Sequence, residues 1–192
     1  MRTSVDGFVA DRDGDSSALY PDIGELRENE VVKQAISSTG AVILGRRSYD
    51  MADGDLTGYE FQVPIFVLTH NAPEEKPRGQ NDRLSVTFVD EDIETVIGRA
   101  KEAAGEKDVV VIGADASQQA LNEGLVDEIG IGIVPVIFGE GIRFLDQLGS
   151  NRIELERTRV TETAADTDIR FRVKNQMEKG SRQRASADRE AD

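Results

Sequence analysis

The apolar positions of this chain change spacing several times, and each change predicts a new element. A helix before Gly40 is predicted by apolar residues at helical spacing: Leu26, Val31, Val32, Ala35 and Ile36. Continuous apolar runs at 41–44, 63–68 and 109–112, and an alternating run at 84–89, predict four strands. Residues 53–60 and 70–83 are rich in Gly, Asp, Asn and Pro and are expected to be loops.

Two more helices are expected among these strands. Asp90 is the predicted N-cap of a helix that ends at Gly105. The apolar stripe of this helix consists of Ile93, Val96, Ile97 and Ala100. A short helix is expected over 115–123, with Asp115 as its cap and Gly124 after its end. Strands and helices therefore alternate, which predicts an α/β fold with a mainly parallel sheet flanked by helices.

The last third of the chain has the pattern of antiparallel strands. Residues 126–137 are strand-like, 138–141 read as a turn, and 153–160 with 169–173 predict a hairpin. The sheet is therefore expected to be mixed. Residues 1–174 are expected to form one domain. The charged residues 175–192 contain no aromatic or β-branched side chains and are expected to form a disordered tail.

Composition narrows the class of protein. The 192 residues suit one domain, and 37 acidic against 23 basic residues give a formal net charge of −14. Such a surface repels nucleic acid and anionic membranes, so neither is an expected partner. With no membrane-spanning apolar run and no leader, a cytoplasmic protein is expected. The absence of cysteine excludes thiolate metal sites, and a single histidine argues against multi-histidine sites.

The strongest chemical signal lies where the strand at 41–44 ends. Gly45, Arg46, Arg47 and Ser48 follow it directly. A glycine lets the backbone approach a ligand, a helix beginning here directs free N–H groups at an anion, and arginines bind phosphate. A phosphate site is therefore predicted, and a strand end with two solvated arginines is the open alternative. Gly113 occupies a similar place between the strand at 109–112 and the next helix.

Five short motifs, in this order along the chain, carry a family resemblance. They are Ser4-Val5-Asp6-Gly7-Phe8-Val9-Ala10, Gly45-Arg46-Arg47-Ser48-Tyr49-Asp50, Val63-Pro64-Ile65-Phe66-Val67-Leu68-Thr69-His70, Gly124-Leu125-Val126-Asp127-Glu128 and Pro135-Val136-Ile137-Phe138-Gly139-Glu140-Gly141. Over residues 3–173 the chain resembles the dihydrofolate reductase-like superfamily, in the branch that holds the reductase domain of riboflavin biosynthesis. The resemblance implies a mixed, mainly parallel sheet flanked by helices, with a C-terminal antiparallel hairpin.

The resemblance also implies a function and a site. The implied activity is transfer of hydride from NADPH to a small heterocyclic or carbonyl/imine substrate. The implied cofactor-binding residues are Gly45, Arg46, Arg47, Ser48, Thr69, His70, Asn71, Gly113, Ala114, Asp115, Ala116 and Ser117. Asp6 and Gly7 are candidates for the substrate side, although a structural turn is the alternative that the residues favour. Relatives that dimerise through their C-terminal strands imply a homodimer.

The chain departs from the family pattern in several places. Gly113 stands alone where the family usually has two adjacent glycines, Phe8 follows Gly7 where the riboflavin branch has a basic residue, and tryptophan is absent. A non-catalytic nucleotide-binding or structural member of the same fold is therefore the alternative function. Only Met1, Arg2 and Thr3 precede Ser4, which implies that the first strand continues upstream; a genuine short strand is the other interpretation.

Overall fold

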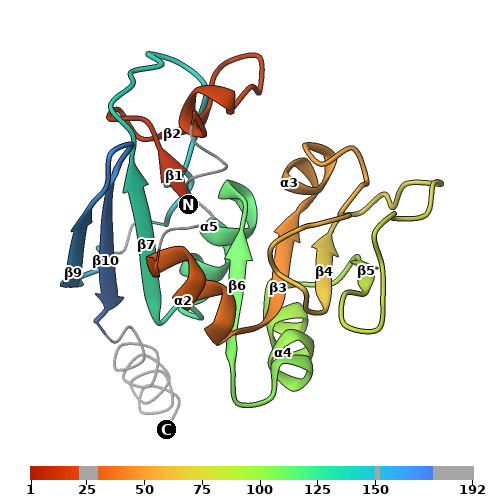
Figure 1. The fold of residues 1–192 in the computed structure, drawn as a ribbon. Coiled ribbons are helices and arrows are strands. Elements are labelled where there is room, and N and C mark those ends of the chain that lie inside the picture. Colours follow the sequence, from red (N-terminus) through yellow and green to blue (C-terminus); the bar gives the residue numbers. More distant parts are fainter. Residues whose placement is uncertain (22–29, 150–151, 175–192) are drawn as a thin grey trace, which may run out of the picture.

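The computed structural model describes residues 1–21, 30–149 and 152–174. The predicted tail at 175–192 and the start of the first predicted helix, including Leu26, lie outside the described residues. The described chain forms two four-stranded sheets and a small two-stranded one, with helices packed around them. Figure 1 shows β7, β6, β3 and β4 pointing the same way, so that their carboxyl ends lie at one edge of the molecule.

The first sheet is entirely parallel and is built around its most apolar strand. Its order is β5 (Val86–Val89), β4 (Ile65–Leu68), β3 (Thr39–Gly45) and β6 (Asp108–Ile112). Helix α3 (Arg46–Asp50) follows β3, α4 (Ile93–Ala104) connects β5 to β6, and α5 (Ala114–Asn122) follows β6. Parallel strands require such crossovers, which cover the sheet and bury its side chains.

Strand β3 is buried on both faces, which explains its continuous apolar run. Ala41 and Ile43 pack on one face against the stripe of α4, including Val96. Val42 and Leu44 pack on the other face in a cluster with Tyr49 and other apolar residues. These two clusters make the parallel sheet a firm support for the loops at its carboxyl edge.

The second sheet is mixed and is built from the two ends of the chain. Its order is β1 (Arg2–Thr3), β7 (Glu128–Ile133), β10 (Thr167–Val173) and β9 (Leu155–Glu162). Strand β1 is parallel to β7, whereas β7, β10 and β9 are antiparallel neighbours. The remaining elements are β2 (Phe8–Ala10), which pairs with β8 (Ile142–Arg143), the 3-10 helix η1 (Ser17–Leu19), and α2 (Glu30–Ser38).

The fold class expected from the sequence is confirmed: the sheet system is mixed, parallel in its first half and closed by a C-terminal antiparallel hairpin. The strand expected over 126–137 ends already at Ile133. Strand β1 has one strand partner among the described residues, β7, and lies at the edge of its hydrogen-bonded sheet. None of the helices in the described ranges combines the length and the apolar character needed to cross a bilayer.

Both predicted caps were wrong. Helix α4 is capped by Asp92, whose carboxylate accepts the Thr95 backbone N–H at 2.9 Å, because the stripe that faces the sheet begins at Ile93. Asp90 instead contacts His70. Helix α5 starts directly after Gly113 and has no side-chain cap bond; the Asp115 carboxylate accepts from the Gln119 side chain one turn later, at 2.8 Å.

Candidate functional site

The loops that follow β3, β4 and β6 lie at the carboxyl edge of the parallel sheet. Two glycines allow the loops after β3 and β6 to approach each other closely. Leu44 of β3 pairs with Ile112 of β6, so Gly45 and Gly113 leave the sheet side by side. A Cβ on Gly113 would lie 3.1 Å from Ser48 Oγ and 3.2 Å from Gly45 N, and the φ of Gly113 is 117°. Glycine is therefore required at position 113 for conformation and for space, and it lets the backbones of the two loops lie together without side chains between them.

Arg46 joins the start of α3 to the end of β4. Its Nε donates to Asp50 Oδ1 at 2.8 Å, and its Nη1 donates to the backbone carbonyl of Asn71. The Thr69 hydroxyl in turn accepts the Asn71 N–H at 3.2 Å. Two of the three predicted cofactor segments are thus connected through Arg46, whose charge is already balanced by Asp50.

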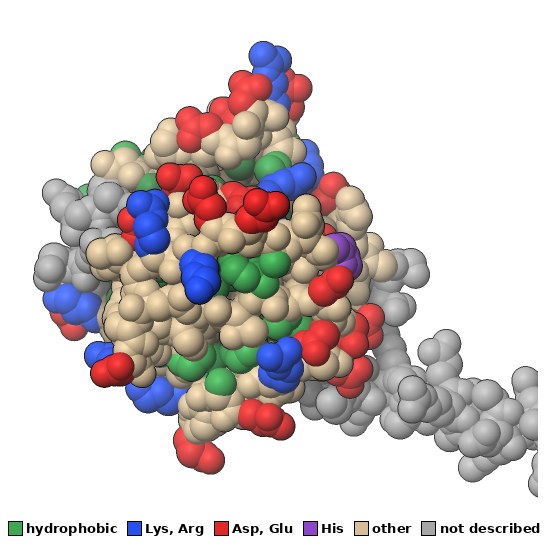
Figure 2. Space-filling view, turned by 90° about the vertical axis from the view of Figure 1, so that its right-hand side faces the viewer, with side chains coloured by type: hydrophobic (Ala, Val, Ile, Leu, Met, Phe, Trp, Pro, Cys, Tyr) green, Lys and Arg blue, Asp and Glu red, His purple; other side chains and the backbone are tan. Residues whose placement is uncertain are grey.

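Arg47 has a different environment from its neighbour. Its side chain is exposed, and within the part of the chain that the structure describes its guanidinium has no hydrogen bond and no ion pair. Figure 2, which looks onto the side of the molecule that carries β5, shows acidic side chains along the upper part with basic ones scattered among them. A cation without a carboxylate partner on such an acidic protein is available to an anionic ligand.

The remaining predicted cofactor residues differ in how far solvent reaches their side chains. His70 and Asp90 form a contact on the surface, with the imidazole 96% exposed. In the first turn of α5, Asp115 is exposed and Ala114 half-buried, whereas Ala116 and Ser117 are buried. Of this helix start, only the backbone and side chains around Ala114 and Asp115 are open to a ligand, and the Asp115 carboxylate opposes a phosphate there.

Asp6 serves as a tie between two loops. Its carboxylate accepts from Ser4 Oγ at 2.6 Å, from the Gly139 N–H at 2.7 Å and from the Phe138 N–H at 3.2 Å. These bonds, led by that from Ser4, lower the pKa of Asp6 to about 2. Gly7 follows with a φ of 86°, which completes the turn. The turn role that the residues favoured at the sequence level agrees with this geometry, and contact with a substrate stays a prediction.

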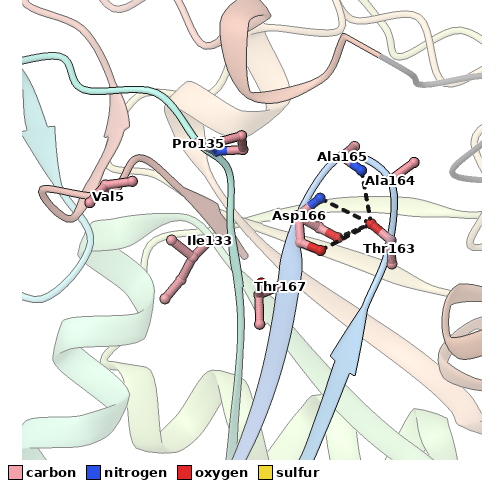
Figure 3. Close-up of a pocket in the computed structure, with 8 residues that line it drawn as sticks. All are labelled: Val5, Ile133, Pro135, Thr163, Ala164, Ala165, Asp166 and Thr167. Carbon is pink, nitrogen blue, oxygen red and sulfur yellow. Dashed lines mark hydrogen bonds between the residues drawn. The ribbon is translucent and has the colours of Figure 1, made fainter.

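Sequence reasoning missed a buried charged group at the end of the second sheet. Arg2 Nε lies 2.9 Å from Asp166 Oδ2, although the two residues are 164 positions apart. A cavity of about 280 Å³ lies nearby, between Val5 and Pro135 on one side and the turn at 163–167 on the other (Figure 3). Neither residue belongs to a motif, so periodicity and spacing contained no signal for the pair.

Comparison with known proteins gives a family match and two distant relatives. The model of the RibD C-terminal domain family matches residues 1–169. Uncharacterized protein YwjB of Bacillus subtilis (strain 168) is 25% identical over 160 residues, which is 83% of this chain and 88% of that protein. Uncharacterized protein YyaP of the same strain is 23% identical over 149 residues, 73% of this chain and 75% of that protein.

Solved structures share the fold at low sequence identity. A putative riboflavin biosynthesis protein from Shewanella sp. PV-4 has a TM-score of 0.74 at 21% identity, over 91% of this chain and 97% of that chain. A diaminohydroxyphosphoribosylaminopyrimidine deaminase/5-amino-6-(5-phosphoribosylamino)uracil reductase from Thermotoga maritima has a TM-score of 0.65 at 18% identity, over 90% and 55%. The dihydrofolate reductase of Enterococcus faecalis, complexed with NADP(H), has a TM-score of 0.56 at 15% identity, over 91% and 94%. This chain spans about half of the Thermotoga protein.

Proposed function

The chain belongs to the RibD C-terminal domain family, and from that premise we propose that it is a reductase that uses NADPH. The observation that carries the proposal is the loop cluster at the carboxyl edge of the parallel sheet. There Gly45 and Gly113 lie in contact and the guanidinium of Arg47 is free of partners among the described residues. Backbone N–H groups and an unpaired arginine at such an edge suit the phosphates of a dinucleotide.

The residues present fit this cofactor in a defined way. The Gly45 and Gly113 backbones and Ala114 would lie along the pyrophosphate, and Arg47 would meet the additional phosphate that distinguishes NADPH from NADH. Thr69, His70 and Asn71 would border the adenosine. When bound, the cofactor supplies a hydride; the protein's contribution is to bind, orient and exclude water. Arg46 would hold the loop after β4 in place through its bond to the Asn71 carbonyl, and its own contact with a phosphate stays a prediction.

The substrate we propose is a small heterocycle or a carbonyl/imine compound. Support comes from the neighbour whose name contains a uracil reductase activity and from the dihydrofolate reductase that shares the fold. Phe8 follows the Asp6–Gly7 turn. The Arg143 guanidinium lies over its ring, with the guanidinium carbon 4.3 Å from the ring centroid. Arg143 therefore supplies a positive charge beside Phe8.

Titration with NADPH and NADH, followed through cofactor fluorescence, tests the cofactor part. NADPH is expected to bind more tightly than NADH, and the difference is expected to disappear in Arg47→Ala. NADPH oxidation is then measured with 5-amino-6-(5-phosphoribosylamino)uracil and with 7,8-dihydrofolate. Equal binding of both cofactors to wild type and to Arg47→Ala would remove this edge from the cofactor site.

A non-catalytic, nucleotide-binding role is the second candidate. A purely structural member of the fold is the other form of this alternative, and it is favoured by the exposed Asp115 carboxylate in the first turn of α5, which opposes phosphate, and by the neutralisation of Arg46 by Asp50. Binding of NADPH without oxidation of it by either compound would support the nucleotide-binding role, and absence of NADPH binding would support the structural one.

We also propose that the chain forms a homodimer through its C-terminal hairpin. One face of β9 and β10 carries Val160, which is 47% exposed, and the half-buried Ile169 and Phe171 next to it. Apolar residues on an open sheet face are typical of a subunit interface. Light scattering of wild type and of Val160→Glu checks this: wild type is expected at twice the 21.0 kDa chain mass and the variant at that mass.

A further inference from the structure

Three aspartates of the chain directly precede a glycine, and the structure gives each pair a different environment. The pairs are Asp6–Gly7, Asp13–Gly14 and Asp53–Gly54. In such a pair the backbone nitrogen of the glycine can attack the aspartate side chain, because glycine has no Cβ to block the approach. Two groups decide whether this happens in the folded protein: the glycine N–H and the aspartate carboxyl group that its nitrogen must reach.

At Asp6–Gly7 both groups are held. The Gly7 N–H donates to the Ser4 carbonyl at 3.0 Å. The Asp6 carboxylate accepts from Ser4, Phe138 and Gly139, and these bonds lower its pKa to about 2. Loss of water from a carboxyl group requires the protonated acid, which is scarce at so low a pKa. This pair is therefore protected at the nitrogen and at the carboxylate.

At Asp13–Gly14 only the nitrogen is held. The Asp13 side chain is 81% exposed, and its carboxylate lies 3.8 Å from Arg12 Nε, beyond hydrogen-bonding distance. The Gly14 N–H donates to the Asp11 carbonyl at 3.1 Å. The nitrogen must give up this bond before it can turn toward the side chain, so this pair is protected on one side.

At Asp53–Gly54, in the loop that follows α3 (Figure 1), neither group is held. The Asp53 side chain is fully exposed, and its carboxylate lies 3.9 Å from Arg78 Nη2, too far for a hydrogen bond. Within the described ranges the Gly54 N–H has no hydrogen-bond acceptor. Asp53 has a φ of 48° and is the one non-glycine residue with a positive φ among those described. This conformation is unfavourable for a residue with a Cβ, so a change of backbone connectivity here relieves strain.

Arg78 adds a cation at the reacting peptide group. Its Nη2 donates to the Asp53 backbone carbonyl at 3.2 Å. That carbonyl shares a peptide group with the Gly54 nitrogen, so the guanidinium stabilises the negative charge that develops when the nitrogen loses its proton. The Asp6 carbonyl accepts from Arg143 Nη1 at the same distance, 3.2 Å. The first pair thus has the cation without the free nitrogen, and only the third pair combines the two.

We propose that Asp53–Gly54 is a modification site, at which aspartate is converted to isoaspartate in the folded protein with help from Arg78. The Gly54 nitrogen forms a bond to Asp53 Cγ, and the bond from Cγ to its hydroxyl oxygen breaks. One water leaves with the proton of the nitrogen, which gives a cyclic imide. Water then adds to either carbonyl of the imide. Addition at the α-carbonyl links the chain through the side chain, whereas addition at Cγ restores aspartate.

The reaction takes up as much water as it releases and needs no oxidant or cofactor. Its product has one additional backbone carbon between positions 53 and 54 and a free α-carboxylate. Isoaspartyl carboxyl methyltransferases esterify such a carboxylate, so an enzyme of this class is the partner expected at this loop. The inference is independent of the proposed reductase function.

The test follows isoaspartate at all three pairs in the full chain. Protein is incubated at neutral pH below its Tm, and a parallel sample is unfolded in guanidinium chloride. Isoaspartate is labelled with isoaspartyl methyltransferase and a radioactive methyl donor, and it is located by peptide mass spectrometry. Asp53→Glu and Arg78→Ala are compared with wild type, and Arg83→Ala removes another exposed arginine of the loop after β4 as the matched control.

In folded wild type, isoaspartate is expected to form at position 53 at least tenfold faster than at positions 6 and 13. In the unfolded sample the three rates are expected to agree within about threefold, because the protecting hydrogen bonds are lost. Asp53→Glu is expected to abolish methyl labelling of the folded protein, since glutamate would have to form a larger ring. Arg78→Ala is expected to slow the reaction at least threefold, and Arg83→Ala to leave it within twofold of wild type.

Two results would overturn the proposal. One is isoaspartate spread evenly over the three pairs of the folded protein. The other is its absence at position 53 in the folded protein while it forms there in the unfolded sample. An unchanged or faster reaction in Arg78→Ala would refute the part assigned to the guanidinium.

Discussion

The two four-stranded sheets bury very different side chains. In the parallel sheet, residues 41–44 of β3 alternate between two apolar clusters, so that both faces are filled by Val, Ile, Leu and aromatic side chains. In the mixed sheet, β7 alternates isoleucine with glycine. Ile129 packs in an apolar cluster with Leu121 of α5, whereas Gly130 and Gly132 lie under arginine and aspartate side chains. One sheet has an apolar interior, and the other has a charged layer on one face.

This charged layer extends beyond the Arg2–Asp166 pair. Asp168 Oδ1 and Arg170 Nε of β10 are 3.6 Å apart, and Arg159 of β9 donates to Gln34 of α2 at 3.3 Å. Apolar packing is insensitive to direction, whereas ion pairs and hydrogen bonds fix orientation. In the proposed reductase, the apolar parallel sheet would supply a rigid edge for the dinucleotide, while the ion pairs and hydrogen bonds of the mixed sheet fix the orientation of its own strands and turns.

Truncation in the apolar sheet is expected to have the largest effect. Ile43→Ala removes a fully buried side chain from the centre of β3, and its expected cost is about 2–5 kcal/mol of unfolding free energy. Urea denaturation measures it. Ile169→Ala in the half-buried face of β10 is the matched substitution and is expected to cost clearly less. Equal losses would mean that the two sheets are packed alike, against the comparison.

Removing the Arg47 side chain is expected to weaken cofactor binding without changing the stability of the fold. Arg47→Ala is expected to weaken NADPH binding by roughly 1.5–3 kcal/mol, the range for hydrogen bonds to charged groups, and to leave the Tm unchanged. Fluorescence titration and thermal unfolding give the two quantities. Arg152→Ala, an exposed arginine near the second sheet, is the control and is expected to alter neither. A similar loss of affinity in the control would point to general charge attraction.

Two glycines of β7 offer a matched pair in the charged sheet. Gly132→Ala is expected to destabilise by about 1–3 kcal/mol, because its Cβ would come within 2.7 Å of the fixed Asp166 carboxylate. Gly130→Ala places its Cβ 3.5 Å from Arg170 Nε, an ordinary contact. It is expected to be neutral or slightly stabilising, since alanine restricts the unfolded chain. Equal Tm values for both variants would show that the carboxylate moves away freely.

The same contrast explains how much of the fold was predictable. The parallel sheet and its helices followed from apolar runs and stripes, because burial on both faces leaves a strong pattern in the sequence. The loop ends at Gly45 and Gly113 were predictable as well, since a strand that ends in glycine before a helix has a clear signature. Errors there were confined to strand starts and helix caps. Strands β4 and β5 each begin two residues later than expected, and Asp90 and Asp92 were both suitable caps for α4, so that the start of the apolar stripe decided between them.

The charged layer of the mixed sheet left no comparable pattern. Arg2 and Asp166 meet only because β1 pairs with β7 and β10 pairs with β7, and pairing of this kind depends on tertiary structure. The glycines of β7 were visible as an alternation with isoleucine, but nothing in the sequence indicated which side chains would cover them. Likewise, Arg46 and Arg47 are adjacent in sequence, yet within the described ranges only the guanidinium of Arg46 is paired, through Asp50 and Asn71.

The smallest expected effect is a pH dependence that comes from Asp6, the tie beside the mixed sheet. Its pKa is about 2 in the folded protein and about 3.9 for an aspartate in the unfolded chain. Its carboxylate therefore stabilises the fold fully above about pH 4, and this contribution is lost as the pH falls toward 2. Thermal unfolding of wild type and Asp6→Asn between pH 6 and pH 2 measures it.

The Tm difference between wild type and Asp6→Asn is expected to be largest at pH 5–6 and to shrink toward pH 2, because protonation removes the same negative charge that the substitution removes. Asp13→Asn is a suitable control, since the Asp13 side chain is 81% exposed and its carboxylate lies 3.8 Å from Arg12 on the same loop. A Tm difference for Asp6→Asn that stays constant across this range would mean that shape, and not charge, holds the 138–139 backbone to the turn. The turn beside the mixed sheet would then be stabilised mainly by packing, as the parallel sheet is.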